Sequence, residues 1–167
     1  MSLLTKIIFA TTATTTGLIA GLLYAYSCSV NLGLGRLTDA AYLTAMQSVN
    51  KAILNPFFFF SFLGTALLLP ICTYLQYNKP LTDCFWYLFG ATLVYLIGVL
   101  GVTMFGNVPL NDRLEAFSIE TASIESLKSM RSEFETAWNN FHFVRTLAAI
   151  VSFVLVILAC LTAKAND

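Results

Sequence analysis

Residues 84–105 read CFWYLFGATLVYLIGVLGVTMF and contain no Lys, Arg, Asp or Glu. A helix that crosses the hydrocarbon core of a bilayer needs roughly 20 such residues, at about 1.5 Å each. The run is continuously apolar rather than alternating, which favours a helix over a strand of a barrel. Three further stretches are almost free of charge, so we predict four membrane-spanning helices, at about residues 7–30, 52–76, 84–105 and 143–163.

The composition of the whole chain agrees with a membrane protein. Of its 167 residues, 57% are hydrophobic and 11% are charged, which excludes an ordinary water-soluble domain. Nine basic residues balance nine acidic ones, so there is no basic excess of the kind that binds nucleic acid. We therefore expect one all-α domain, residues 1–167, an integral membrane four-helix bundle whose first partner is the lipid bilayer.

The orientation of the bundle depends on few charges. Four spans place both termini and the short second connection on one side, with Lys6, Lys79 and Lys164 close to the helix ends. These lysines favour both termini in the cytoplasm, at a bacterial inner membrane. The opposite side carries more Lys and Arg in total, which favours the reverse orientation.

The first and third connections both have helical patterns. Apolar residues recur at three and four spacing in residues 37–53, as in an amphipathic helix on the bilayer surface that is capped by Thr38 or Asp39. Residues 111–140 show a similar pattern and contain neither Pro nor Gly, so we expect that helix to continue into the fourth span.

Small residues mark two places where helices can approach closely. Gly17 and Gly21 form one small-xxx-small pattern, and Gly98 and Gly101 form a second close-approach site. Both predict helix packing, within one chain or between the chains of a homo-oligomer.

Polar side chains gather at one end of all four predicted spans. They are Tyr24, Ser27, Asn31, Asn50, Asn55, Asn107, Asn111, Asp112, Arg113, Trp138, His142 and Arg145. Trp138, His142 and Arg145 are spaced i, i+4 and i+7 and so share one helix face. Polar groups at membrane depth usually face a bundle interior or a partner, so we predict a polar pocket that is open at one membrane face and apolar below. The alternative is an interfacial Trp138 and an Arg145 that extends to lipid headgroups.

The segment 107–113, NVPLNDR, is predicted to end the third span in a turn. Pro109 lacks a backbone donor and restricts Val108, so we expect the third span to break near residues 105–106. Asn107 and Asn111 suit a turn, and Asp112 with Arg113 would form a charged pair at the mouth of the pocket.

Residues 107–114, NVPLNDRL, resemble the signature of the anthrone oxygenase-like family of small four-span membrane proteins, a domain-of-unknown-function family in bacteria. The resemblance continues through 21–27 GLLYAYS, 34–36 LGR, 46–56 MQSVNKAILNP, and Trp138 with 141–142 FH and 145–146 RT. It covers nearly the whole chain in the same order. Family members commonly have Trp-Asn where Phe141 and His142 stand here.

The resemblance implies an activity. Fungal relatives oxidise anthrones to anthraquinones with dioxygen, without a tightly bound metal or flavin. Such chemistry needs an apolar slot, a base and a stabiliser for an enolate-like anion. On this chain the resemblance suggests His142 as base and Arg145 or Arg113 as anion stabiliser, with Asp112 as the alternative base. It further suggests Asn107 and Asn111 as orienting donors, and Trp138 with Tyr24 as stacking walls.

The sequence leaves two function classes open. With one His and no adjacent carboxylate or thiol pair, we expect no metal site and no bound cofactor; a haem held by His142 alone is the alternative. The first class is a cofactor-independent oxygenase acting on a small lipophilic aromatic substrate. The second is a non-enzymatic membrane protein that binds a small lipophilic molecule or acts as an assembly partner.

Overall fold

The computed structural model describes residues 2–77 and 79–163, and in these residues all regular structure is helical. The elements are α1 Leu3–Ala25, η1 Tyr26–Val30, α2 Asn31–Leu34, α3 Asp39–Ala52, α4 Pro56–Leu75, α5 Asp83–Leu93, η2 Val94–Gly101, η3 Thr103–Asn107, α6 Val108–Glu115, η4 Ile119–Thr121 and α7 Ile124–Thr162. Of the η segments, η1, η2 and η3 are π-helical and η4 is a 3₁₀ turn. The expected all-α class is confirmed.

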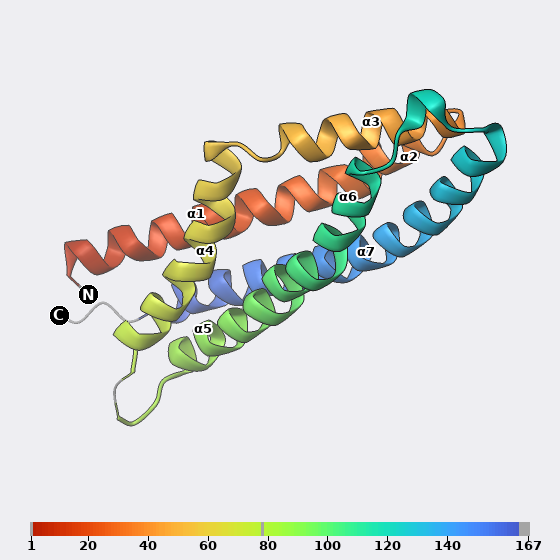
Figure 1. Ribbon diagram of the computed structural model, residues 1–167. Helices are drawn as coiled ribbons and strands as arrows, with labels where there is room; N and C mark the ends of the chain where they lie inside the picture. Colours follow the sequence, from red (N-terminus) through yellow and green to blue (C-terminus); the bar gives the residue numbers. More distant parts are fainter. Residues whose placement is uncertain (1, 78, 164–167) are drawn as a thin grey trace.

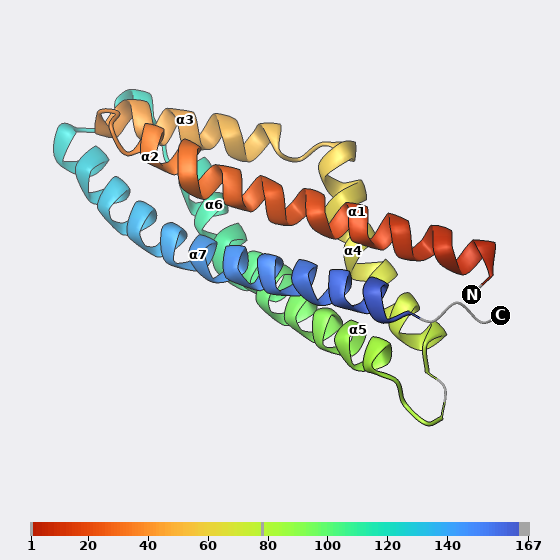
Figure 2. The ribbon, with the colours of Figure 1, turned by 180° about the vertical axis from the view of Figure 1, so that it is seen from behind.

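Four continuous helices are long and apolar enough to cross a membrane. They are Leu3–Leu34, Pro56–Leu75, Asp83–Glu115 and Ile124–Thr162, and they overlap the four expected stretches. The α7 helix packs against both α1 and α5, and α4 packs against the same two helices, which makes a bundle (Figures 1 and 2). The start of α1, the end of α7 and the α4–α5 connection lie at one end, as four spans require; Lys164 lies outside the described residues.

The interior of the bundle is mainly apolar, with threonine and serine hydroxyls buried in it, and its outside is apolar as well. Ile19, Tyr95 and Val156 are buried at its centre, where the Tyr95 hydroxyl donates a hydrogen bond to the Phe62 carbonyl at 2.9 Å. Large apolar side chains such as Phe105 point outward and are exposed. A helix that is apolar on all sides is typical of a membrane span, because lipid covers what the bundle does not.

Beyond the apolar bundle, α2, α3, α6 and the first half of α7 form a second unit, which we call the cap (Figure 1). Its core contains Tyr42, Leu43, Met46, Leu114 and Phe134. The predicted helix in residues 37–53 is confirmed as α3, but its apolar face is buried against α6 and α7, whereas a helix lying on the bilayer would turn that face to lipid. Burial, with a smaller contribution from the Glu135 carboxylate, raises the pKa of Tyr42 above its ordinary value, so the phenol stays neutral.

The prediction that Pro109 breaks the third span near residues 105–106 is wrong. The helix continues without interruption from α5 to the end of α6 at Glu115, and Pro109 occupies the first turn of α6. The π-helical segment η3 immediately precedes it. A π turn shifts the hydrogen-bond register by one residue, which lets the helix absorb the missing donor of a proline.

Several glycines allow helices of the same chain to approach closely. A Cβ atom on Gly98 would lie 2.6 Å from the Ala148 Cβ, and one on Gly17 would lie 2.9 Å from a ring carbon of Phe153. A Cβ on Gly21, by contrast, meets no atom within 4 Å. The close approaches of Gly17 and Gly98 are therefore made to α7 within one chain.

We predict that Gly98→Ala weakens the packing of η2 on α7. Overpacking of this kind costs about 1–3 kcal/mol, which outweighs a helix-propensity gain of about 1 kcal/mol from alanine. Thermal unfolding in detergent should show a lower midpoint for Gly98→Ala and an equal or higher one for the control Gly21→Ala. Ala148→Gly in the Gly98→Ala background should restore the midpoint. Equal stability of Gly98→Ala and Gly21→Ala would contradict the prediction.

Candidate functional site

A layer of polar side chains lies where the apolar bundle meets the cap, and we call it the polar layer. Its members are Tyr26 and Ser27 from η1, Thr103 and Asn107 from η3, Asn111 from α6, and Trp138, His142, Arg145 and Thr146 from α7. Two of the three elements that face α7 here are π-helical. Such turns are frequent at functional sites because they re-aim side chains within a helix.

His142 is the centre of the polar layer and is only 2% exposed. Its Nδ1 accepts hydrogen bonds from Arg145 Nε at 3.3 Å and Nη2 at 3.2 Å. A guanidinium has donors only, so Nδ1 carries the lone pair and the ring proton sits on Nε2. Nε2 then donates to Ser27 Oγ at 2.9 Å, and Ser27 Oγ donates to the Leu23 carbonyl at 3.0 Å. The hydrogen bonds thus define a neutral imidazole of one tautomer.

Arg145 is a cation without an acidic partner in the described part of the chain, where the ion pairs involve other residues. Besides His142, its guanidinium contacts Thr103 Oγ1 through Nη1 at 3.5 Å and lies 5.1 Å from the centre of the Trp138 ring. A charged side chain at membrane depth is costly when it has no counter-ion. Cation–π contact lowers that cost but leaves the positive charge uncompensated.

Trp138 forms one wall of the polar layer and is 3% exposed. Its ring stacks on His142 at 5.0 Å between centroids, and its Nε1 donates to Asn111 Oδ1 at 2.9 Å. Asn107, itself 1% exposed, donates from Nδ2 to the Trp138 carbonyl at 3.2 Å, while its Oδ1 is buried without a donor among the described residues. The structure therefore brings together six of the residues predicted to form the polar pocket: Ser27, Asn107, Asn111, Trp138, His142 and Arg145.

The prediction that Tyr24 forms the second aromatic wall of the site is wrong. Tyr24 is 58% exposed and points away from the bundle. Tyr26 takes that place, with its ring 5.3 Å from Trp138 and 5.1 Å from His142. The buried face of α1 runs through Ala20 and Leu23, and three to four residues further along a helix reach Tyr26 and Ser27. Extending that face from the apolar residues would have identified Tyr26.

The predicted charged rim of Asp112 and Arg113 is absent from the polar layer. Both residues are exposed, and Arg113 pairs with Glu133 at 2.6 Å on the outside of the cap. The cause is the unbroken helix: Asn107, Asn111 and Leu114 share one face at i, i+4 and i+7, so residues 112 and 113 point the other way. Asp112 therefore lies away from His142 and is removed from the candidate bases.

Three further predicted residues lie outside the hydrogen-bonded layer. Asn55 caps α4: its Oδ1 accepts from the Phe58 amide at 3.0 Å and its Nδ2 donates to the Ala52 carbonyl at 2.9 Å. Asn31 and Asn50 are half-buried, and within the described residues the Asn50 Nδ2 has no acceptor. The side chain of Asn55 is thus used in hydrogen bonds to nearby backbone groups. Neither Asn31 nor Asn50 is hydrogen-bonded to His142 or Arg145.

An apolar groove lies apart from the predicted polar pocket. The side chains of the polar layer pack against one another, whereas this groove of about 980 Å³ lies between α1, α4 and α7. Its lining includes Gly21, Asn55, Phe58, Ser61 and Phe153.

The fold and the polar layer define a class: a four-helix membrane protein with a buried His–Arg pair at the junction of bundle and cap. The family model for anthrone oxygenase matches residues 49–155, which is more than half of the chain. The chain therefore belongs to the anthrone oxygenase family, as the resemblance of its motifs indicated. No curated protein and no solved structure gives a significant match.

Proposed function

We propose that the protein is a membrane-embedded, cofactor-independent oxygenase that oxidises a small lipophilic aromatic carbon acid of the anthrone type. Family membership supports an oxygenase-like role. The observation that carries the proposal is the contact between His142 Nδ1 and the Arg145 guanidinium, at 3.2–3.3 Å. It sets a neutral base beside a cation that has no carboxylate partner in the described chain.

The two groups match the two needs of the reaction. An anthrone carries its acidic hydrogens on the ring carbon opposite its carbonyl. Proton transfer from that carbon to His142 Nδ1 leaves an enolate-type anion, whose oxygen replaces Nδ1 as the partner of Arg145. Arg145 then has a negative partner when the substrate anion forms and none before. An interaction that is stronger with the developing anion than with the neutral substrate lowers the activation barrier.

The oxidation itself needs only dioxygen. The substrate anion passes one electron to O2, and the resulting carbon radical combines with superoxide to give a hydroperoxide anion at the same carbon. That anion takes back the proton from His142, and loss of water then forms the second carbonyl. One anthrone and one O2 give one anthraquinone and one H2O, so His142 and Arg145 are regenerated.

The other members of the polar layer hold this pair in place. Ser27 Oγ accepts a hydrogen bond from the Nε2–H of His142 at 2.9 Å. Because this hydrogen bond keeps the ring proton on Nε2, Nδ1 remains the basic nitrogen. Asn111 and Asn107 fix Trp138 at its ring nitrogen and its carbonyl. Trp138 and Tyr26 pack against the His142 ring and fix its plane.

The test is oxygen uptake by the purified protein in lipid nanodiscs, with anthrone as the probe. We expect catalysed uptake above the rate of empty nanodiscs, with about one O2 consumed per anthraquinone formed, as the balanced reaction demands. An absorption spectrum of the same sample should lack haem and flavin bands. No uptake above empty nanodiscs with anthrone or any phenol offered would overturn the proposal.

A second candidate function is non-enzymatic binding of a lipophilic molecule. The apolar groove between α1, α4 and α7 favours it, because its volume of about 980 Å³ lies in the range of small-molecule sites and its lining is largely apolar. Saturable binding of anthrone that Gly21→Leu abolishes, together with no oxygen uptake, would select this function over the oxygenase.

A further inference from the structure

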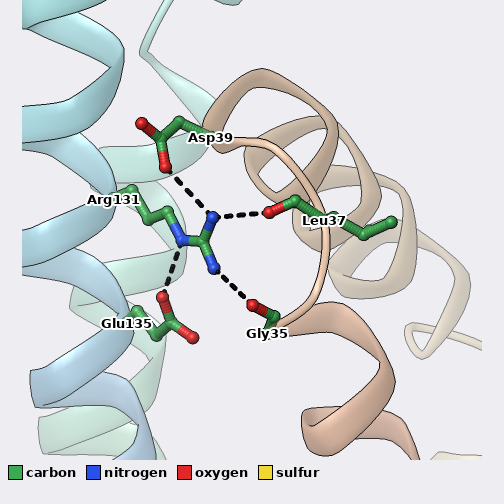
Figure 3. Close-up of polar contacts among 5 residues, drawn as sticks. All are labelled: Gly35, Leu37, Asp39, Arg131 and Glu135. Atoms are coloured by element: carbon green, nitrogen blue, oxygen red, sulfur yellow. Dashed lines mark hydrogen bonds and ion pairs between the residues drawn. The ribbon is translucent and has the colours of Figure 1, made fainter.

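We infer that Arg131 is a positioning residue for the polar layer, although it lies about three helical turns away from His142. The inference rests on the proposed function for its kinetic consequence. Its structural basis is a set of contacts that joins α7 to the turn between α2 and α3 (Figure 3). We call this set of contacts the clasp.

Arg131 uses its planar guanidinium on four acceptors. Its Nε donates to Glu135 Oε2 at 2.8 Å, and its Nη1 donates to the Leu37 carbonyl at 2.7 Å and to Asp39 Oδ1 at 3.0 Å. Its Nη2 donates to the Gly35 carbonyl at 3.0 Å. The side chain is 15% exposed, and its charge sits beside carbonyls that follow the C-terminal end of α2, where a cation is favourable.

The clasp is one of two sets of contacts that hold the segment containing Tyr26 and Ser27. The other is the half-buried packing of Tyr26 and Leu34 on the core of the cap, where the Tyr26 hydroxyl donates to Met46 Sδ at 3.2 Å. The segment consists of η1 and α2, and none of its residues is buried. It is anchored on one side by Leu23, which is buried in the bundle, and on the other by the clasp at Gly35 and Leu37. Because Tyr26 and Ser27 lie inside this segment, their distance from His142 depends on both anchors.

The clasp and the polar layer are two points on one antiparallel seam. On α7, Arg131 faces Gly35, and eleven residues later His142 faces Ser27. An offset of eleven residues is close to three full helical turns, so both side chains lie on the same face of α7. Release of the clasp should therefore let η1 move away from α7 and loosen the Nε2 contact with Ser27.

The experiment uses Trp138 as a reporter inside the polar layer. The chain has two tryptophans, so Trp86→Phe, at an exposed position on α5, leaves Trp138 as the sole emitter. In that background we expect Arg131→Gln to shift the emission to longer wavelength and to raise the acrylamide quenching constant at least about twofold. With anthrone as substrate, kcat should fall about tenfold while KM stays within about twofold, because a misplaced base slows chemistry more than binding.

Two further variants make the result interpretable. Glu133→Gln is the matched control, because Glu133 lies on α7 like Arg131 but forms an exposed ion pair with Arg113 of α6. This variant should leave the emission and quenching of Trp138 as in the parent. Arg131→Lys keeps the charge but loses the fork to the two carbonyls, so it should give an intermediate quenching constant, and it carries the test if Arg131→Gln does not fold.

The outcomes separate the inference from the proposed function. Unchanged emission and quenching in a folded Arg131→Gln or Arg131→Lys, with only a lower unfolding midpoint, would overturn the positioning role. If the parent consumes no oxygen with anthrone, the oxygenase proposal fails. The response of Trp138 then still decides whether Arg131 positions the polar layer.

Discussion

Replacing Arg145 by alanine is expected to lower anthrone-dependent oxygen uptake by about a hundredfold or more, the usual cost of losing a preorganised charge that faces a developing anion. The guanidinium meets Nδ1 of His142 and the ring of Trp138, and it has no carboxylate to release among the described residues. The substitution therefore removes charge stabilisation without leaving an unpaired acid. The measurement is kcat/KM in nanodiscs.

Two further variants serve as controls for this prediction: Arg145→Lys and Lys128→Ala. Arg145→Lys keeps the charge but not the planar fork, so a loss of about tenfold is expected. Lys128→Ala removes another cation of α7, one that is exposed in the cap, and should change the rate by less than about twofold. If Arg145→Ala keeps more than about a third of the wild-type rate, Arg145 does not stabilise the anion.

The sequence predicts the main helices and part of the polar layer because both depend on local rules. Charge-free runs of about 20 residues are required by the bilayer, so the four spans follow from residue spacing. The i, i+4, i+7 stripe on α7 places Trp138 and His142 together whatever packs against them. The same periodicity, applied through residue 109, also puts Asn107 and Asn111 opposite Trp138.

The errors arise where tertiary packing or helix register decides. Pro109 lacks a hydrogen-bond donor, but whether that loss breaks a helix depends on the π turn before it. Tyr24 and Tyr26 differ by two positions, which is a rotation of about 200° on a helix, and the packing of α1 on α7 turns Tyr26 inward, on the face that continues Ala20 and Leu23. The clasp of Arg131 uses carbonyls of Gly35 and Leu37, and backbone acceptors carry no signal in the sequence.

Replacing His142 by alanine is expected to have an effect as large as that of Arg145→Ala. The reason is different: the substrate proton loses its acceptor, and general-base catalysis contributes about a hundredfold or more. His142→Ala also leaves Ser27 and Arg145 without their shared partner, so unfolding midpoints should be measured alongside the rates. Oxygen uptake with anthrone across a range of pH is the measurement.

His142→Asn is the decisive variant, because asparagine keeps hydrogen-bonding groups in place of the imidazole but removes its basic nitrogen. An amide has no basic nitrogen near neutral pH but still accepts from Arg145 and donates to Ser27. If His142 is the base, His142→Asn should be as inactive as His142→Ala while unfolding at a temperature closer to wild type. If His142→Asn instead retains most of the wild-type rate, His142 orients Arg145 through a hydrogen bond and is not the proton acceptor. Comparing the two variants at one pH therefore separates proton transfer from positioning.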